Sequence, residues 1–321
     1  MSVILDVRSL AKHYVDANGA AVRAVDDVSF SLAAGEVLGV VGESGCGKTT
    51  LGRTIMRLME PTRGEILLEG RDFATLSGRS LRAARGRMQM IFQDPFGSLN
   101  PRHTAGAIIA EPLIIHGRYG DGARVSELLS IVGLPRDAAS RYPHEFSGGQ
   151  RQRIAIARAL ALEPKIVIAD EPVSALDVSI QSQILNLIAE LRMRLGLSML
   201  FISHDLSVIR HIADRVAVMY LGKIVEIGSA ADVFAAPRHP YTRALLAAAP
   251  RPLRQTLAMS SDRRRQITLE GELPDPANPP PGCAFHGRCV CALPLCQATP
   301  PVMKDVSDGA HKVACHLAEL A

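Results

Sequence analysis

Short runs of apolar, mostly β-branched residues recur along the first two thirds of the chain without polar alternation. They are Val37–Val41, Met88–Phe92, Ile166–Ala169 and Met199–Ile202. Runs of this kind are typical of strands that are covered on both faces, as in a parallel sheet. Segments of helical period separate them. This alternation predicts an α/β fold whose core sheet is mainly parallel.

The segment from about residue 95 to about residue 160 has a different pattern. It carries few strand signals, and helical periodicity is visible over Gly106–Ile115 and Ala123–Val132. We therefore expect a helical subdomain, at about 95–160, inserted into the α/β core.

The last third begins with another strand pattern. The runs Arg215–Tyr220 and Lys223–Ile227 flank Leu221-Gly222, which predicts a β-hairpin. A helical pattern over Arg243–Ala249 follows. Residues 250–281 are then rich in Pro, Arg, Ser and Asp, which indicates a linker, and we expect its arginines to be solvated.

Composition narrows the class of protein. The chain has 321 residues, enough for one large domain and an appendage, with ordinary fractions of hydrophobic (47%) and charged (21%) residues. Few aromatic residues and a formal net charge of +4 do not indicate a nucleic-acid partner. No apolar run approaches the roughly 18–20 residues needed to cross a bilayer, and the N-terminus does not resemble a signal peptide. We expect the protein to remain in the cytoplasm.

A phosphate-binding loop directly follows the first apolar run. Its residues match the pattern G-x-x-x-x-G-K-[ST] and comprise Gly42, Glu43, Ser44, Gly45, Cys46, Gly47, Lys48 and Thr49, with Thr50 next. Glycines allow backbone N–H groups to turn toward phosphate oxygens. We expect Lys48 to neutralise the β- and γ-phosphates of a nucleotide and the Thr49 hydroxyl to bind Mg²⁺. Cys46 is interpreted as a small packing residue.

Two acidic residues end the third apolar run. Asp170 and Glu171 follow Ile166–Ala169, and the carboxyl ends of such strands are where ligands bind. We expect Asp170 to hold Mg²⁺ directly or through water. Glu171 is predicted to act as general base toward the attacking water.

A second anion site is predicted at Phe146-Ser147-Gly148-Gly149-Gln150, before a helical run. Ser147 can cap that helix, and the free N–H groups at its start attract anions. Two anion sites in one chain suggest that the second serves a nucleotide held by another subunit.

These motifs resemble the ABC ATPase superfamily, whose signature usually has Leu where this chain has Phe146. The resemblance implies further site residues. Tyr14 would stack on adenine, Gln93 would contact Mg²⁺ or the attacking water, Asp177 would belong to the D-loop, and His204 would contact the γ-phosphate. Since Glu171 and His204 are both present, a non-hydrolysing regulatory role is disfavoured. A soluble nucleic-acid-associated ABC ATPase is a less favoured alternative.

Longer phrases resemble the ATP-binding subunits of oligopeptide and dipeptide importers. They are Ile91–Arg102, Tyr142–Glu145 and His239–Thr242. The resemblance implies an ABC ATPase domain over residues 1–250, a P-loop (RecA-like) core with an N-terminal antiparallel β portion, and a C-terminal extension over 251–321. Uptake of peptides is favoured, and nickel, opines or oligosaccharides stay open as solutes.

The same resemblance implies an assembly at the cytoplasmic face of the inner membrane. A second ATPase subunit, an unlike paralogue rather than an identical copy, would pair head to tail with this one. Two membrane permease subunits would dock beside Asp94–Arg102, and an external solute-binding protein would act indirectly.

Cysteines crowd the end of the chain. Cys283, Cys289, Cys296 and Cys315 have the spacing C-x5-C-x6-C-x18-C, and Cys291 is an extra thiol. Four thiolates can hold zinc or a 4Fe-4S cluster. The phrase Gly282–Cys289 resembles peptide-importer subunits associated with an iron–sulfur cluster, so a structural 4Fe-4S cluster is favoured. Zinc and no metal are the alternatives.

Overall fold

The computed structural model describes residues 2–15, 19, 21–120, 122–248, 271–307 and 311–318. Within them, the central sheet has eight strands in the order β11-β12-β10-β9-β3-β8-β7-β6. Five neighbouring strands are parallel: β6 (Met88–Ile91), β7 (Ile166–Asp170), β8 (Ser198–Ile202), β3 (Val37–Val41) and β9 (Arg215–Tyr220). Each apolar run predicted for the parallel core therefore forms a strand, and its ends lie within one residue of the expected positions. The runs are mostly apolar because both faces of the sheet are buried.

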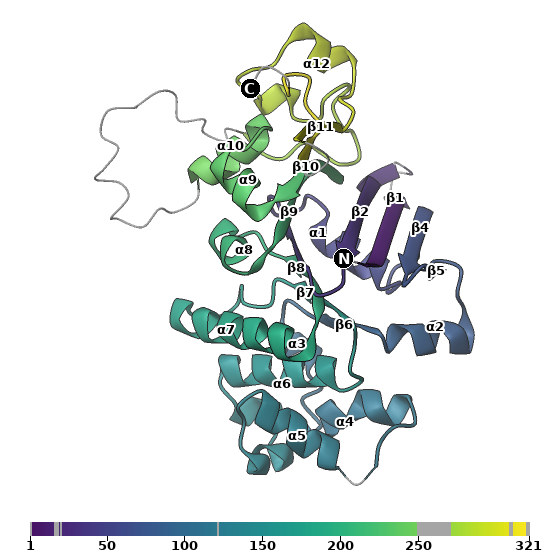
Figure 1. Ribbon diagram of the computed structural model, residues 1–321, viewed down its shortest axis with the longest axis vertical. Helices are drawn as coiled ribbons and strands as arrows, with labels where there is room; N and C mark the ends of the chain where they lie inside the picture. The colour runs from purple at the N-terminus through teal and green to yellow at the C-terminus, as the bar shows by residue number, and fades with distance from the viewer. Residues whose placement is uncertain are drawn as a thin grey trace.

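Helices cover this sheet (Figure 1). They are α1 (Lys48–Ile55), α7 (Val178–Leu195) and α8 (Leu206–Ile212). Side chains of β3 that alternate along the strand enter two different hydrophobic clusters, Val37 and Val41 in one, Leu38 and Val40 in the other. The sheet is thus buried on both faces.

A second, four-stranded sheet is antiparallel and has the order β2-β1-β4-β5. Its strands are β1 (Val3–Val15), β2 (Ala21–Ala33), β4 (Arg63–Leu68) and β5 (Arg71–Asp72). Leu5, Val25 and Ile66 from this sheet pack in one cluster with Leu51 and Ile55 of α1. The N-terminal antiparallel portion expected from the resemblance is therefore present, and it lies against the helix that leaves the phosphate loop.

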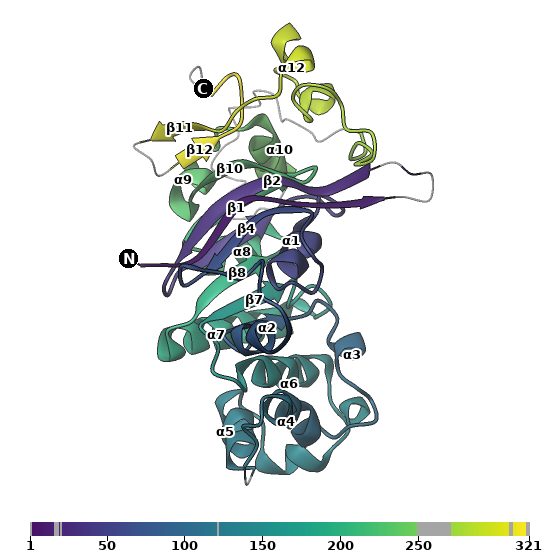
Figure 2. The ribbon, with the colours of Figure 1, turned by 90° about the vertical axis from the view of Figure 1, so that its right-hand side faces the viewer.

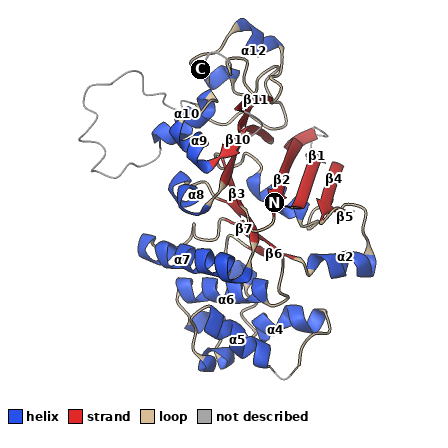
Figure 3. Ribbon diagram, viewed as in Figure 1, coloured by secondary structure: helices blue, strands red, loops and turns tan. Residues whose placement is uncertain are grey.

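Helices dominate the segment between β6 and β7, as Figure 3 shows. They are α3 (Pro95–Ser98), α4 (Ala105–Ile115), α5 (Ala123–Ile131), α6 (Gly148–Leu160) and the short 3-10 turns η1 (Arg136–Ser140) and η2 (Pro143–Glu145). The helix α2 (Gly78–Arg85) lies before β6. The two helices predicted here from periodicity are α4 and α5, and they begin and end within a residue of the expected positions.

The C-terminal residues do not stand apart from the core. β12 (His311–Val313) pairs antiparallel with β10 (Lys223–Ser229), and β11 (Lys304–Ser307) pairs with β12, so the extension lengthens the central sheet. Figure 2 shows this end of the molecule with α9 (Ala230–Ala235), α10 (Pro240–Ala248) and α12 (Pro294–Ala298). The predicted hairpin is β9–β10, with Tyr220 opposite Lys223.

The predicted linker falls mostly outside the described residues. Residues 249–270 are not described, and they include the basic stretch with Arg251, Arg254 and Arg263–Arg265. Among the helices of the described ranges, none has the length and hydropathy required to cross a membrane.

Candidate nucleotide site

The phosphate loop joins β3 to α1 and is shaped by glycines. Gly42 and Gly47 have φ of 156° and 105°, and a Cβ at either position would lie 2.2 Å from the Met219 carbonyl oxygen or 2.0 Å from the Ala24 carbonyl oxygen. Any side chain would therefore push the loop away from β2 or β9. The loop conformation is fixed by close backbone contacts that only glycine permits at these two positions.

Lys48 lies at the start of α1 with its side chain folded back over the loop. Its Nζ donates to the carbonyl oxygens of Gly42 at 2.8 Å and Glu43 at 2.9 Å, and the residue is only 5% exposed. The ammonium thus sits inside the loop. Cys46 is buried beneath it, and burial raises the pKa of its thiol, so the thiol stays neutral and packs as expected.

Thr49 and Asp170 connect the loop to the end of β7. The Thr49 hydroxyl donates to Oδ1 of Asp170 at 2.9 Å, and Asp170 is fully buried. Burial raises the pKa of Asp170, while the Thr49 hydrogen bond and the charge of Arg53 oppose that rise. Among the residues that the structure describes, Oδ2 of Asp170 has no hydrogen-bond partner. A buried carboxylate oxygen without a partner, beside a hydroxyl, fits a Mg²⁺ ion, which prefers such oxygens.

Three polar side chains meet next to the loop. Oε2 of Glu171 accepts from Nε2 of Gln93 at 3.0 Å and lies 3.0 Å from Nδ1 of His204. Glu171 has φ of 46°, an unusual conformation for a residue other than glycine, and such strain is common at functional sites. Its position follows from the end of β7, whereas Gln93 follows β6 and His204 follows β8. Three neighbouring parallel strands therefore bring these groups together.

A pocket of about 590 Å³ opens above the loop. Predicted site residues that line it are Tyr14, Ser44, Gly45, Cys46, Gly47, Lys48, Thr49, Thr50, Gln93, Glu171 and His204. The hydroxyl of Tyr14 lies 2.8 Å from the Met59 sulfur, which holds the ring at the pocket edge. The structure thus gathers residues that are 190 positions apart in sequence, from Tyr14 to His204, around one cavity.

The signature residues lie elsewhere. Ser147 caps α6 by accepting from the Gln150 N–H, and Gln150 accepts in return from the Ser147 N–H. A Cβ on Gly149 would lie 2.6 Å from the Ile180 side chain, so α6 and the start of α7 pack closely. Neither these residues, with Gly148, nor the exposed Asp177 line the pocket of their own chain.

Sequence patterns did not indicate several other pocket residues. Val22, Arg23, Ala24, Leu221, Gly222 and Pro276 also line the cavity. Most are backbone neighbours from β2 and the β9–β10 turn, which carry no motif. Pro276 belongs to the C-terminal extension, and its carbonyl oxygen accepts from the Arg23 N–H at 3.2 Å.

The tail cysteines lie near one another. Burial is the main cause that raises the pKa of the Cys283 and Cys315 thiols and that of Cys289, which reaches about 11. Neighbouring thiols contribute: Cys296 and Cys315 act on Cys283, and Cys283 and Cys315 act on Cys289. Even so, no three His, Cys, Asp or Glu side chains of the described ranges are arranged to hold a metal ion.

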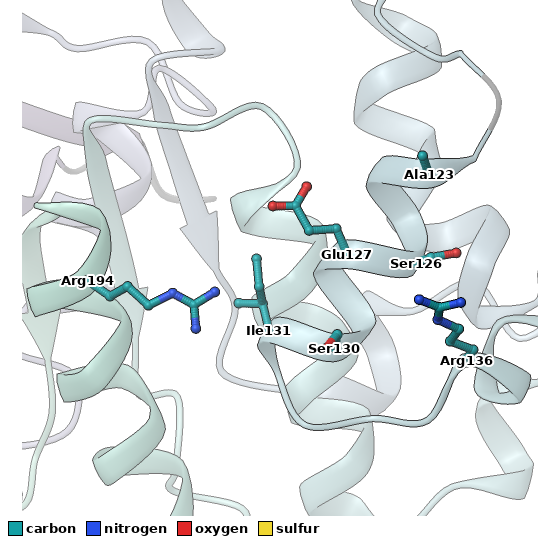
Figure 4. Close-up of a pocket in the computed structure, with 7 residues that line it drawn as sticks. All are labelled: Ala123, Ser126, Glu127, Ser130, Ile131, Arg136 and Arg194. Carbon is teal, nitrogen blue, oxygen red and sulfur yellow. The ribbon is translucent and has the colours of Figure 1, made fainter.

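A separate hollow of about 550 Å³ lies among the helices (Figure 4). It is lined by Ala123, Ser126, Glu127, Ser130, Ile131, Arg136 and Arg194. Arg194 reaches toward it from α7, while Arg136 lies on its other side. None of the predicted site residues lines it, so it is not part of the nucleotide site.

A phosphate loop after β3, two acidic residues at the end of β7 and a separate capped signature helix define an ABC-type ATPase cassette. The ABC transporter family model matches residues 25–174, and the model for the oligopeptide/dipeptide transporter C-terminal region matches residues 225–296. The chain therefore belongs to the ATP-binding subunits of ABC transporters of the oligopeptide/dipeptide type. It is an ATPase whose hydrolysis of ATP energises transport.

Relatives match over nearly the whole chain. The oligopeptide transport ATP-binding protein AppF of Bacillus subtilis is 54% identical over 98% of this chain and 97% of its own. A Brucella ovis protein named for peptide import ATP binding is 56% identical, covering 97% of each chain.

A solved structure supports the fold. The dimeric cassette MJ0796 bound to ADP and Pi is 29% identical, with a TM-score of 0.63, over 70% of this chain and 98% of that one.

Proposed function

We propose that this subunit energises the uptake of peptides through a membrane permease. The main observation behind this proposal is that Gln93 and His204 both contact one oxygen of Glu171 beside the phosphate loop. The relatives of this chain are named for peptide import, which favours peptides as the solute. The test is ATP hydrolysis by the full chain assembled with its permease and solute-binding protein. Peptides should stimulate phosphate release, whereas stimulation by nickel, opines or oligosaccharides alone would contradict the proposed solute.

The site residues take the following roles in this proposal. Backbone N–H groups of Gly42–Thr50 and the Lys48 ammonium bind the phosphates, and Thr49 and Asp170 hold Mg²⁺, with Gln93 near it. Mg²⁺ would neutralise charge on the phosphates when bound. Tyr14 supports the adenine from the pocket edge.

Glu171 accepts a proton from the attacking water in the same proposal. Gln93 and His204 hold its carboxylate through Oε2, and this leaves Oε1 to face the water. His204 is exposed, so it can also turn toward the γ-phosphate when a nucleotide binds.

The second ATPase subunit completes the site. Ser147, Gly148, Gly149 and Gln150 do not line their own chain's pocket, and they present a capped helix N-terminus to the outside. A head-to-tail pair would place this helix, with Asp177 nearby, against the nucleotide of the partner. We propose an unlike paralogue as that partner, and the dimeric MJ0796 cassette supports such pairing in general.

The permease would dock at the boundary between the sheet and the helices α2, α4 and α6. A groove of about 590 Å³ there is lined by Leu81, Phe92 and Ile115, among others, and Ile115 is 54% exposed. Phe96, 58% exposed, lies close by in sequence, in the predicted docking loop Asp94–Arg102. Because Phe92 directly precedes Gln93, docking of the permease in this groove would act on the position of Gln93. It would also keep the subunit at the cytoplasmic face of the inner membrane.

We divide the chain into an ABC ATPase domain over 1–250, with a helical subdomain at about 95–160, and an extension over 251–321. The helices α3 to α6 support the insertion. Phe285 is buried in the same cluster as Tyr220 and Tyr241, which supports an extension that packs onto the residues before it.

A 4Fe-4S cluster held by Cys283, Cys289, Cys296 and Cys315 is proposed as a structural cofactor of the extension. Cys296 and Cys315 contribute to the raised pKa of Cys283, and Cys283 and Cys315 contribute to that of Cys289, which supports the cluster because such contributions require proximity. Because the thiols are not arranged as a metal site, they would have to move closer on binding. Anaerobic purification followed by iron and sulfide analysis is the test. Zinc, or no metal at all, would refute the cluster.

A further inference from the structure

The C-terminal extension contacts the phosphate loop through an ion pair. Arg288 donates from its two terminal guanidinium nitrogens to the two carboxylate oxygens of Glu43, at 2.7 and 2.9 Å. Its side chain is only 7% exposed, and that of Glu43 is 27% exposed. A bidentate pair with this little solvent is geometrically specific, because both planar groups must keep one relative orientation.

Glu43 is held at three points. Besides the ion pair, its N–H donates to the Tyr241 hydroxyl at 2.9 Å, and its carbonyl oxygen accepts from Lys48 at 2.9 Å. The position of Glu43 therefore determines where the Lys48 ammonium rests. It also sets the direction of the backbone that enters the glycine-rich turn.

The holding residues are themselves rigid. Tyr241 is fully buried, and its ring packs against Tyr220 at 4.7 Å and Phe285 at 5.4 Å between centroids. Phe285 is 2% exposed and directly precedes the turn η3 (His286–Arg288), which ends at Arg288. Arg288 thus projects from a well-packed base.

A second segment of the extension lies at the pocket. Pro276 lines it and accepts from the Arg23 N–H, while Leu273 lies 3.8 Å from where a Cβ of Gly45 would be. The extension therefore touches the loop near Gly45 as well as at Glu43. Contacts at two separated places constrain the loop more than either alone.

We infer that Arg288 is a positioning residue for ATP binding: acting through Glu43, it holds the phosphate loop in the conformation that receives the nucleotide. The extension is thereby a structural part of the ATP site. This inference goes beyond the transport function and does not depend on a metal in the extension or on the transported solute.

The experiment is a double-mutant cycle in the full chain with Arg288→Ala, Glu43→Gln and both together. Binding of the non-hydrolysable analogue AMP-PNP with Mg²⁺ gives the Kd, and phosphate release gives KM and kcat. Lys312→Ala is the matched control, because Lys312 is an exposed cation of the same extension, on β12. Circular dichroism and thermal unfolding without nucleotide report on the fold.

Each single substitution should raise the Kd by roughly 5- to 30-fold, a usual range for coupling between separate sites. The double variant should bind AMP-PNP no more weakly than whichever single variant has the higher Kd, since the two substitutions remove the same interaction. KM should rise with Kd while kcat changes less than about twofold, as expected for lost binding. Arg288→Lys keeps the charge without the planar fork and should be intermediate. Lys312→Ala should match the unmodified protein.

Two results would overturn the inference. One is a folded Arg288→Ala variant that binds AMP-PNP like the unmodified protein. The other is a double variant whose Kd rises by the product of the two factors by which the single substitutions raise it. If Arg288→Ala does not fold, Glu43→Gln decides, since it leaves the extension unchanged. Unaltered binding by that variant would then reject the inference.

Discussion

The Thr49 hydroxyl lies 2.9 Å from Oδ1 of Asp170 and joins the first turn of α1 to the end of β7. The pair brings a hydroxyl and a buried carboxylate to the place where the phosphate loop ends. Two oxygen ligands on separate elements are a common basis for Mg²⁺ sites in nucleotide-binding proteins.

Thr49→Val should therefore raise the Mg²⁺ concentration required for half-maximal ATP hydrolysis by about tenfold, the effect of losing one hydrogen-bonding or ligand contact. The measurement is phosphate release in a Mg²⁺ titration. Thr54→Val is the control, because Thr54 lies on the same helix but donates to the Thr50 carbonyl oxygen. An equal Mg²⁺ requirement in both variants would argue against Thr49 as a ligand.

Glu171→Gln should retain ATP binding and lose turnover. The amide keeps the shape of the side chain but cannot accept the proton of the attacking water, so kcat should fall by about 10²- to 10⁴-fold. Nucleotide affinity and phosphate release, measured on the same preparation, separate the two effects. Hydrolysis at the unmodified rate would refute the general-base assignment.

Lys48→Ala should weaken ATP binding itself. Lys48 is buried in the loop and is the cation closest to the phosphate positions in the sequence motif. Loss of charge-assisted contacts worth about 1.5–3 kcal/mol corresponds to at least a tenfold rise in Kd, which direct titration will measure. The exposed Lys165 offers a control: Lys165→Ala should leave the affinity unchanged.

Phe285→Ala should destabilise the protein by about 3–5 kcal/mol, the usual cost of truncating a buried Phe. The ring packs against Tyr220, Tyr241 and His239, so the substitution leaves a cavity between the extension and the core. Urea unfolding gives the free energy. Leu293→Ala, at a 42% exposed position of the extension, should change it by less than about 0.5 kcal/mol. Similar losses in both variants would show that the extension is not packed as described.

His239 should make the protein less stable in acid. Burial lowers its pKa to about 3, so between pH 6.5 and 3 the unfolded chain binds a proton there that the folded chain does not. The contribution of the neutral His239 to the free energy of unfolding is therefore fully present above pH 6.5, and it is lost as the pH falls below that value. At pH 5.5 the loss from this residue is about 1.4 kcal/mol relative to pH 7.5.

The measurement compares free energies of unfolding at the two pH values for the unmodified protein and for His239→Gln. The variant should lose about 1.4 kcal/mol less between them. His144→Gln, at an exposed position, should behave like the unmodified protein. An identical pH dependence in His239→Gln would show that this imidazole is not kept neutral by the fold.

Local patterns were sufficient for the parallel strands and the phosphate loop. Val37–Val41 is apolar throughout because both of its faces are buried, and that requirement is visible in the sequence alone. The spacing from Gly42 to Thr49 reflects a single turn of backbone around an anion, so the motif can be recognised without knowing which distant residues contact the loop. Gln93 and His204 were predicted from the resemblance to ABC ATPases and not from local patterns. They meet Glu171 because each of the three residues follows a strand that ends at the same edge of the sheet.

Tertiary structure alone decided how the extension is used. Arg288 and Glu43 are 245 positions apart, and no periodicity or spacing relates them. The pairing of β12 with β10 is likewise invisible in a three-residue strand. Sequence patterns record what each segment needs locally, namely burial, caps and turns. Which distant partners satisfy those needs depends on the simultaneous packing of the whole chain, and here that packing places the C-terminal residues against the phosphate loop.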